Sequence, residues 1–449
     1  MNILHYFLGF PPYRSGGLTK YAYDLMTAQA AAGHQVSGLW PGQMQLLRKT
    51  VDIRCRGKVS GVKSFELINP LPVALDEGIT DPEAFMAPCQ GKGYLTFLQK
   101  LQPEVIHIHT LMGLHREFLD AAQKLGIRTV FTSHDYYGIC PKVTLFRNGD
   151  VCQGDKDCKH CVACNMRGLS MKKILIMQSP VYRLLKNSPV VKFLRKRHRG
   201  NFFTEEVAPE IPEHVDVEKQ AAQYQKLRQY YVDMLNKVDK IHFNSTLTEN
   251  IYRAYVTPKD SCVVSITHRD VQDHRDLAHR EADCLRLTCL APAKPFKGYL
   301  VLKNALDALW ASGKRDFVLK MYGYVPNPAP YMQVQEEGFA YKDLPQMMAD
   351  TDVLIAPSVW YETFGFTVLE ALSFGVPVII TDHVGAKDIV GEGGMVIPAG
   401  SVETLQEAIA SLTPQKLESM RLAIRQSLTI KTWTEFLKEN ETLYEDSKI

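Results

Sequence analysis

The sequence lacks any uninterrupted apolar run near the ~18 residues that a membrane-spanning helix needs. Its first residues carry no basic segment and soon reach Pro11 and Pro12, so we expect no secretory signal peptide. The net charge is only +3 over 449 residues, which by itself gives no argument for nucleic-acid binding. The length of 449 residues predicts two or three domains, and 45% hydrophobic and 22% charged residues are ordinary for a soluble globular chain. Because neither a signal peptide nor a membrane span is expected, we expect a cytoplasmic protein.

A strand, a helix and a second strand are predicted close together in the last quarter of the chain. Apolar runs at 352–356 and 378–381 each have the length of a buried strand. Between them, 366–374 is rich in helix formers and is followed by Gly375, a residue that often ends helices. Two strands joined through a helix indicate a βαβ unit, and therefore a parallel sheet.

Two glutamates, Glu362 and Glu370, flank the N-terminus of this predicted helix. On one straight helix they would lie roughly 12 Å apart along the axis. Glycosidase carboxylates are about 5–9.5 Å apart, so a hydrolase pair is disfavoured. An extended ligand with hydroxyl-rich ends and an anionic middle, such as a nucleotide sugar, fits better, because the free N–H groups of a helix N-terminus favour an anion. The alternative is an ordinary βαβ unit with exposed glutamates.

The spacing Glu362-x7-Glu370, followed by Gly375-x-Pro377, resembles the signature of retaining GT-B glycosyltransferases, most closely glycosyltransferase family 4. The resemblance implies an α/β fold of two Rossmann-like parallel-sheet domains that face a cleft, with no catalytic metal. It also implies that Glu362 contacts the donor sugar and that Glu370 holds the nucleotide ribose. The backbone N–H groups between them are assigned to the donor sugar or phosphate, namely those of Phe364, Gly365 and Phe366.

Gly16 and Gly17 lie in a loop between a predicted strand at 2–9 and a predicted helix at 18–32. Paired glycines let a ligand approach the backbone closely, although a plain turn is the commoner explanation. The resemblance implies that this loop meets the donor phosphate.

Histidines lie near the C-terminal ends of two further predicted strands, 105–110 and 128–135. Ligands of open α/β sheets bind beyond the carboxyl ends of strands, close to these histidines. The resemblance directs His134 at the donor sugar. His107 and His109 have two interpretations: they face an acceptor cleft, or they are structural, which is the commoner case.

A lysine and a glycine, Lys297-Gly298, match a pair that neutralises the donor diphosphate in the family that the sequence resembles. That family also has an arginine five residues earlier, and this sequence has Pro292 there. Lys294 is a candidate substitute, although lysine lacks the guanidinium fork. The departure at Pro292 leaves open a homologue that binds the donor without transferring it.

Five of the ten cysteines are clustered between residues 140 and 164. Cys158-x2-Cys161-x2-Cys164 has the spacing of metal ligands, with Cys152 as a fourth thiolate and Cys140 as an alternate ligand. The spacing predicts a structural zinc ion, with an iron–sulfur cluster as the other choice. The remaining alternative is a set of reduced thiols.

The segment 165–204 contains ten basic residues and no acidic residue. Apolar residues are interleaved with the basic ones, a mixture that suits an anionic membrane surface. A solvated helix face and an RNA-binding patch are the alternatives. The basic residues are Arg167, Lys172, Lys173, Arg183, Lys186, Lys192, Arg195, Lys196, Arg197 and Arg199.

These patterns predict a first Rossmann-like domain at 1–266, which contains a Cys-rich and basic insertion at about 140–235. A linker at 267–282 leads to a second, nucleotide-sugar domain at 283–430. A final helix at 431–449 is expected to return to the first domain. Three linker histidines are expected to be solvated: His268, His274 and His279.

The sequence therefore predicts a retaining glycosyltransferase in which His134, Glu362 and Lys297 act on a UDP- or GDP-sugar. The expected acceptor is a glycan or a lipid-linked glycan in cell-envelope polysaccharide or glycoconjugate synthesis, with peripheral contact through about 165–204 at the inner membrane face. Nucleic acid is not expected as a partner, and the oligomeric state stays open. The alternatives are a GT-B-fold donor-binding protein without transferase activity, a phosphorylase of the same fold, and a Cys-cluster nucleic-acid-binding protein.

Overall fold

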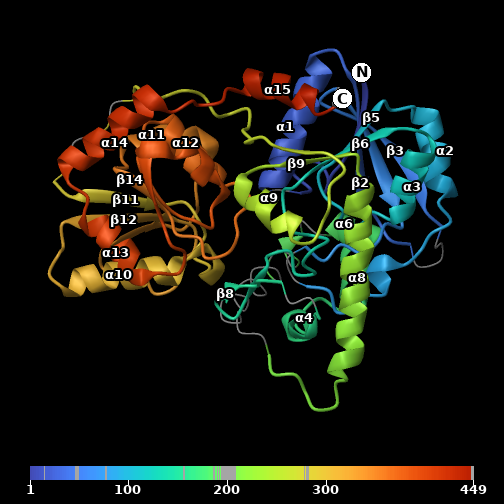
Figure 1. Ribbon diagram of the computed structural model, residues 1–449, viewed down its shortest axis with the longest axis horizontal. Coiled ribbons are helices and arrows are strands. Elements are labelled where there is room, and N and C mark those ends of the chain that lie inside the picture. The colour runs from blue at the N-terminus through green and yellow to red at the C-terminus, as the bar shows by residue number, and fades with distance from the viewer. Residues whose placement is uncertain are drawn as a thin grey trace.

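The chain folds into two lobes, each built on a mainly parallel sheet (Figure 1). The predicted α/β architecture of two Rossmann-like domains is therefore confirmed. The computed structural model describes residues 1–14, 16–45, 50–75, 78–154, 157–185, 188–189, 191, 193, 209–277, 279 and 283–445.

The first sheet has eight strands in the order β10-β9-β6-β5-β1-β2-β4-β3. All its neighbouring strands are parallel except β3 and β4, which form an antiparallel hairpin at the edge. The strand β3 is polar and mostly exposed, so it lacks the apolar run by which the inner strands were predicted. The strands are β1 Asn2–Tyr6, β2 Gln35–Pro41, β3 Asp52–Val59, β4 Val62–Ile68, β5 Val105–Ile108, β6 Arg128–Thr132, β9 Lys240–Phe243 and β10 Ser261–Val263.

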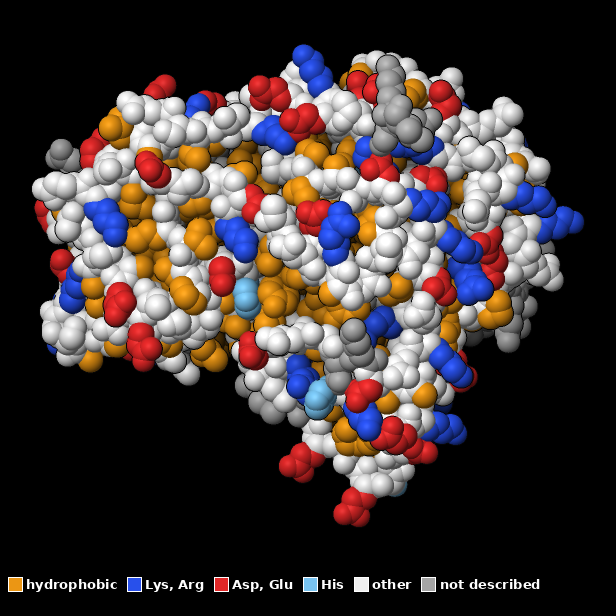
Figure 2. All heavy atoms as spheres, viewed as in Figure 1, with side chains coloured by type: hydrophobic (Ala, Val, Ile, Leu, Met, Phe, Trp, Pro, Cys, Tyr) orange, Lys and Arg blue, Asp and Glu red, His pale blue; other side chains and the backbone are white. Residues whose placement is uncertain are grey.

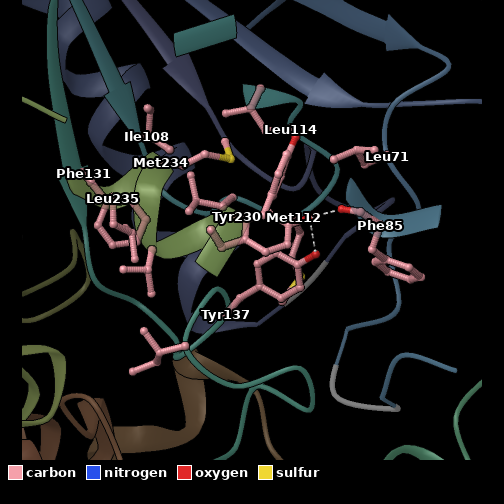
Figure 3. Close-up of a cluster of buried hydrophobic side chains, with 14 of the residues drawn as sticks. Leu71, Phe85, Ile108, Met112, Leu114, Phe131, Tyr137, Tyr230, Met234 and Leu235 are labelled. Carbon is pink, nitrogen blue, oxygen red and sulfur yellow. Dashed lines mark hydrogen bonds between the residues drawn. The ribbon is translucent and has the colours of Figure 1, made fainter. Parts of the chain in front are cut away.

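Five principal helices accompany this sheet: α1 Gly17–Ala31, α2 Lys92–Leu101, α3 Arg116–Lys124, α8 Val217–Lys237 and α9 Thr246–Arg253. Aromatic side chains of α8 enter the core of the lobe (Figure 3). There the Tyr137 hydroxyl donates to the Tyr231 hydroxyl at 2.8 Å, and the Tyr231 hydroxyl donates to the Phe85 carbonyl at 2.8 Å. These buried hydrogen bonds fix the start of the segment that carries the clustered cysteines.

The second sheet has six parallel strands in the order β13-β12-β11-β14-β15-β16. Helices α10 and α13 cover one face, and α11, α12 and α14 cover the other (Figure 1). The predicted βαβ unit is present, since β14 and β15 are parallel neighbours joined through α12. The elements are β11 Leu285–Cys289, α10 Tyr299–Ala311, β12 Phe317–Tyr322, β13 Met332–Gln335, α11 Leu344–Ala349, β14 Val353–Ala356, α12 Phe366–Ser373, β15 Val378–Thr381, β16 Gly394–Ile397, α13 Val402–Ala410 and α14 Pro414–Ser427.

The last helix, α15 Trp433–Thr442, crosses back to the first lobe and contacts α1 (Figure 1). Just beyond it, Tyr444 is buried in that lobe, where its hydroxyl accepts from Gln29 Nε2 at 2.9 Å. Short 3-10 helices occur at Ala84–Met86, Pro295–Lys297, Tyr341–Asp343, Gly385–Ile389 and Gly391–Gly393.

Between β6 and α8, the elements among the described residues are small: β7 Phe146–Arg147, β8 Asp150–Val151, α4 Lys159–Asn165, α5 Met171–Met177 and α6 Pro180–Leu185. Among the described residues, no helix is both long and apolar enough to cross a membrane. Several basic residues predicted for membrane contact lie outside the described residues: Lys186, Lys192, Arg195, Lys196, Arg197 and Arg199.

On the face shown in Figure 2, hydrophobic side chains gather where the two lobes meet. Lys, Arg, Asp and Glu are interspersed over the rest of this face, so its described side chains form no extended basic surface. A small net charge of +3 and this mixed arrangement agree with each other.

Candidate active site

Glu362 lies in the loop between β14 and α12, ahead of the helix rather than on it. Its backbone N–H donates to the His383 carbonyl at 2.8 Å, and its own carbonyl accepts from the Gly385 N–H at 2.9 Å. The loop after β15 thus holds Glu362 from both sides. Glu362 and Glu370 therefore do not share one straight helix.

The Glu362 carboxylate is tied to a cation and a hydroxyl. Lys297 Nζ lies 2.8 Å from Oε1, and the buried Ser358 hydroxyl donates to Oε2 at 2.7 Å. Burial acts to raise the pKa of this carboxyl, but Lys297 and Ser358 outweigh it and the pKa is lowered. Glu362 is therefore ionised at neutral pH beside a positive charge.

Lys297 owes its position to close packing of two loops. A Cβ on Gly298 would lie 1.8 Å from the Pro357 carbonyl oxygen, and its φ of 79° also favours glycine. The N–H groups of Val359 and Trp360 both donate to the Phe296 carbonyl, at 3.0 and 3.1 Å. The loop that carries Lys297 is thus joined directly to the loop that carries Glu362.

Lys294 and Lys297 flank one pair of aromatic rings. Lys294 Nζ lies 5.2 Å from the Phe296 ring centroid, and Lys297 Nζ lies 4.7 Å from that of Trp360. Pro292, at the position of the family's arginine, is exposed, and its carbonyl accepts from the Lys294 N–H at 2.7 Å. The turn closed by this hydrogen bond places Lys294 beside Phe296.

Glu370 lies inside α12, is only 4% exposed, and borders a cavity of about 180 Å³. Its Oε1 is 3.0 Å from His268 Nε2. His268 and Tyr341 also line the cavity. Burial and Glu370 together raise the pKa of the Tyr341 hydroxyl above its usual value. A buried carboxylate, a histidine and a phenol therefore face one cavity.

The expectation that His268 is solvated is wrong, because this side chain is 1% exposed. A buried carboxylate needs a hydrogen-bond partner, and the linker supplies one by bringing His268 to Glu370. His274 is exposed, as expected, and its ring also stacks on that of Phe374, with ring centroids 4.8 Å apart. His279 is half-buried, and burial lowers its pKa.

The glycine loop of the first domain reaches α12 of the second. A Cβ on Gly17 would lie 3.5 Å from the Phe366 ring. One turn further along α1, Lys20 Nζ donates to Asp270 Oδ2 at 2.6 Å and lies 5.0 Å from the Tyr341 ring centroid. The two predicted phosphate-binding loops thus lie close together at the junction of the domains. Lys20 was not predicted; its place one turn after the Gly-Gly loop was the available signal.

His134 lies beside the Glu362 loop. Its carbonyl accepts from the Thr363 hydroxyl at 3.1 Å, and its ring is 4.5 Å from that of Tyr21. Burial lowers the pKa of His134 to about 3, so the ring is neutral at physiological pH. Thr363 is held again by α9, since the hydroxyls of Ser245 and Thr248 donate to its carbonyl at 2.8 and 2.9 Å. These contacts between domains were not predicted, because no local pattern marks them.

Behind His134 lies a buried group of histidines, His5, His107 and His109, and one ring nitrogen from each lies within 4.8 Å of the other two. His109 Nδ1 is 3.3 Å from His134 Nε2. Burial keeps the pKa values of all three low. Because His107 and His109 are fully buried, the structural interpretation holds for them rather than the acceptor cleft.

Two family models match the chain. Residues 15–150 match Glycosyltransferase Family 4, and residues 285–414 match Glycosyl transferases group 1, which together is more than half of the chain. The matched ranges include the glycine loop, His134, Lys297 and both glutamates of the site.

Curated relatives match shorter stretches. The O-antigen chain mannosyltransferase B of Escherichia coli is 31% identical over 106 residues, 23% of this chain and 24% of that protein. The GDP-mannose-dependent alpha-mannosyltransferase of Mycobacterium tuberculosis is 35% identical over 95 residues, 20% of this chain and 25% of that protein. The matches thus span about a quarter of each relative.

Solved structures match over nearly the full chain. The sucrose-phosphate synthase of Thermosynechococcus elongatus has a TM-score of 0.54 at 14% identity, with 98% of each chain covered. Anabaena Alr3699/HepE in complex with UDP and glucose has a TM-score of 0.54 at 15% identity, covering 99% of this chain and 100% of that one. At such identities the likeness shows the fold alone.

Proposed function

Because the chain belongs to the family 4 and group 1 glycosyltransferases, we propose that it transfers a sugar from a nucleotide-sugar donor to a glycan or lipid-linked acceptor. One arrangement carries the proposal: the Glu362–Lys297 pair and the cavity at Glu370 lie at opposite ends of the N-terminal turn of α12. An elongated donor fits this order, with its sugar at the Glu362–Lys297 pair, its charged diphosphate at the N-terminal turn of α12 and its ribose at the Glu370 cavity.

In this proposal the ribose hydroxyls bind Glu370 and the donor-sugar hydroxyls bind Glu362. The diphosphate lies between them, at the N–H groups of Phe364, Gly365 and Phe366, where the helix dipole favours an anion. The glycine loop around Gly17 closes the site from the first domain.

The chemistry that the site supplies is electrostatic. As the glycosidic bond breaks, negative charge grows on the departing nucleoside diphosphate, and the Lys297 ammonium and the helix N–H groups stabilise it. Lys297 lies 2.8 Å from Glu362, so the phosphate shares this cation with the carboxylate that holds the sugar. Neutral His134 contributes a ring nitrogen for a sugar hydroxyl. We infer retention of the anomeric configuration from the family that the sequence resembles.

We propose a GDP-sugar, and GDP-mannose in particular, as the donor to test before others. Three relatives are named mannosyltransferases, and one of these is named GDP-mannose-dependent. UDP-sugars form the second group, since one similar fold was solved with UDP and glucose.

The acceptor side of the proposal rests on helices α5 and α6. Ile176, Val181 and Leu184 are 62%, 63% and 85% exposed, next to Lys172 and Lys173. Exposed apolar and basic side chains together suit the surface of an anionic membrane, where a lipid-linked acceptor resides.

Sedimentation with vesicles of anionic and of neutral lipid tests this contact. The substitutions Val181→Ser and Leu184→Ser together should reduce binding to anionic vesicles. Leu300→Ser, on the 51% exposed Leu300 of α10, should leave it unchanged. Equal binding of the wild type, the double variant and Leu300→Ser to anionic vesicles would reject the membrane contact.

Nucleoside-diphosphate release from a panel of GDP-, UDP- and ADP-sugars, with membrane extract as acceptor, tests the transferase itself. We expect release from one donor, and its loss in Glu362→Gln. The matched control, Glu407→Gln on the exposed face of α13, should keep wild-type turnover. Tight donor binding without release would instead favour a donor-binding protein that lacks transferase activity, with Pro292 as the residue to restore to arginine.

A further inference from the structure

Four cysteines of the segment 140–164 surround one small cavity. Cys140, Cys152, Cys161 and Cys164 all line a space of about 20 Å³ next to α8. Cys158 does not line it, although its sulfur contacts that of Cys161. All ten cysteines of the chain lie within the described residues, and none forms a disulfide.

Cys140 sits in a tight turn that directs backbone N–H groups at its sulfur. Burial raises the pKa of the Cys140 thiol, while the N–H groups of Leu145 and Lys142 oppose that rise. Val143 and Leu145 have φ values of 70° and 48°, which non-glycine residues, and a β-branched valine above all, rarely adopt. Backbone held in this way is found where a site constrains it.

The other three cysteines reach the cavity from two elements. The Cys152 N–H donates to the Leu145 carbonyl at 2.6 Å, which ties the strand pair β7–β8 to the Cys140 turn. Cys161 and Cys164 are three residues apart on α4, so both sulfurs lie on the same side of that helix. Three separate pieces of chain therefore converge on the cavity.

The surroundings of the cavity are positively charged. Arg228 of α8 places Nη2 at 3.5 Å from Cys161 Sγ, and its Nε donates to the Ile139 carbonyl at 3.0 Å. Lys142 and Arg147 also act on Cys164 as nearby cations. Among the described residues, no carboxylate lines the cavity. Cations that face a set of sulfurs offset the net negative charge of a metal bound by four thiolates.

We propose that Cys140, Cys152, Cys161 and Cys164 bind one zinc ion. Four thiolates are a complete ligand set for structural zinc, and all four line one cavity. All five clustered cysteines are described, and no three of their sulfurs lie within 4.8 Å of one another. Zinc binding therefore turns the side chains inward to the usual Zn–S distance of about 2.3 Å.

The site would join the two domains beside the donor site. The Phe146 ring, in β7, lies 6.3 Å from the ring of Phe296, the residue before Lys297. Zinc would hold this segment of the first domain against the loop that carries Lys297. The ion supports the active site from outside and takes no part in the transfer.

Metal content of the purified full-length chain tests the proposal without depending on activity. We expect about one zinc ion per chain, with little iron. Cys152→Ser and Cys164→Ser should each lose the zinc. Cys262→Ser, on a half-buried cysteine of the first sheet, should keep it. Replacement of zinc by cobalt should give the intense absorption of a cobalt–thiolate site in the wild type and in Cys262→Ser.

The Cys158→Ser variant distinguishes the proposed ligand set, which omits Cys158, from a set based on the CxxCxxC spacing, which includes it. We expect Cys158→Ser to retain the zinc. Three results would overturn the proposal: no zinc above the level of a protein without the cluster, zinc retained by both Cys152→Ser and Cys164→Ser, or iron with acid-labile sulfide. Loss of transferase activity alone would bear on the proposed function, whereas the metal count bears on this site.

Discussion

The Glu362 loop and the cysteine segment both approach Phe296, and they are held in different ways. The Glu362 loop joins a buried strand to a helix and is fixed by backbone hydrogen bonds to the loop after β15. The cysteine segment has two-residue strands, a seven-residue helix and residues at unusual φ. The Glu362 loop is thus joined by hydrogen bonds to a sheet, whereas the cysteine segment has few such bonds among its described residues, and we infer that a metal ion holds it.

The largest effect is expected from removing the cation of the Glu362 loop. Lys297→Met should lower the turnover number by about 10²–10³-fold, as loss of one group that stabilises transition-state charge does. The measurement is nucleoside-diphosphate release at saturating donor. Lys303→Met, on α10 and paired with Asp307, is the matched control and should stay near wild type. If both variants turned over normally, the electrostatic role of Lys297 would be excluded.

Alanine substitutions at two glycines compare how closely the two regions are packed. Gly298→Ala places a Cβ 1.8 Å from the Pro357 carbonyl and should lower the free energy of unfolding by about 3 kcal/mol or more. Gly149→Ala, between β7 and β8, has a similar φ of 87° but nothing within 4 Å, so only the conformational cost of about 1–2 kcal/mol applies. Urea unfolding of the two variants measures both values, and equal losses would contradict the difference in packing.

The smallest effect concerns pH. Glu362 has a lowered pKa in the folded chain, so its contribution to stability is present above its usual pKa of 4.5 and is lost as the pH falls through the lowered value. The difference in unfolding free energy between wild type and Glu362→Gln should therefore shrink as the pH falls from neutral to below the usual pKa of 4.5. A difference that grew in acid would reverse the assigned direction of the pKa shift.

Much of the second domain was predictable because its signals are local. Buried parallel strands appear as apolar runs, and the helix between 366 and 373 has a glycine at each end. The same locality made Glu362, Glu370 and Lys297-Gly298 recognisable as a motif. The structure brings them to one end of one sheet.

Contacts between distant segments were not predictable. His268 pairs with Glu370 across 102 positions, and Ser245 reaches Thr363 across 118, with no local pattern to mark either pair. The β3–β4 hairpin was missed because its edge strand is polar. The CxxCxxC spacing favoured Cys158 and named Cys140 only as the alternate ligand, whereas the folded turn brings Cys140 to the cavity.

The proposed function requires that Glu370 and its cavity bind the ribose of a nucleoside diphosphate. Calorimetric titration of GDP, UDP and ADP into the wild type tests it most directly, with Glu370→Gln and Glu407→Gln titrated alongside. We predict that one nucleotide binds, that Glu370→Gln weakens its affinity at least about tenfold, and that Glu407→Gln does not change it. Absence of binding by all three nucleotides, or equal affinity in Glu370→Gln and the wild type, would contradict the account.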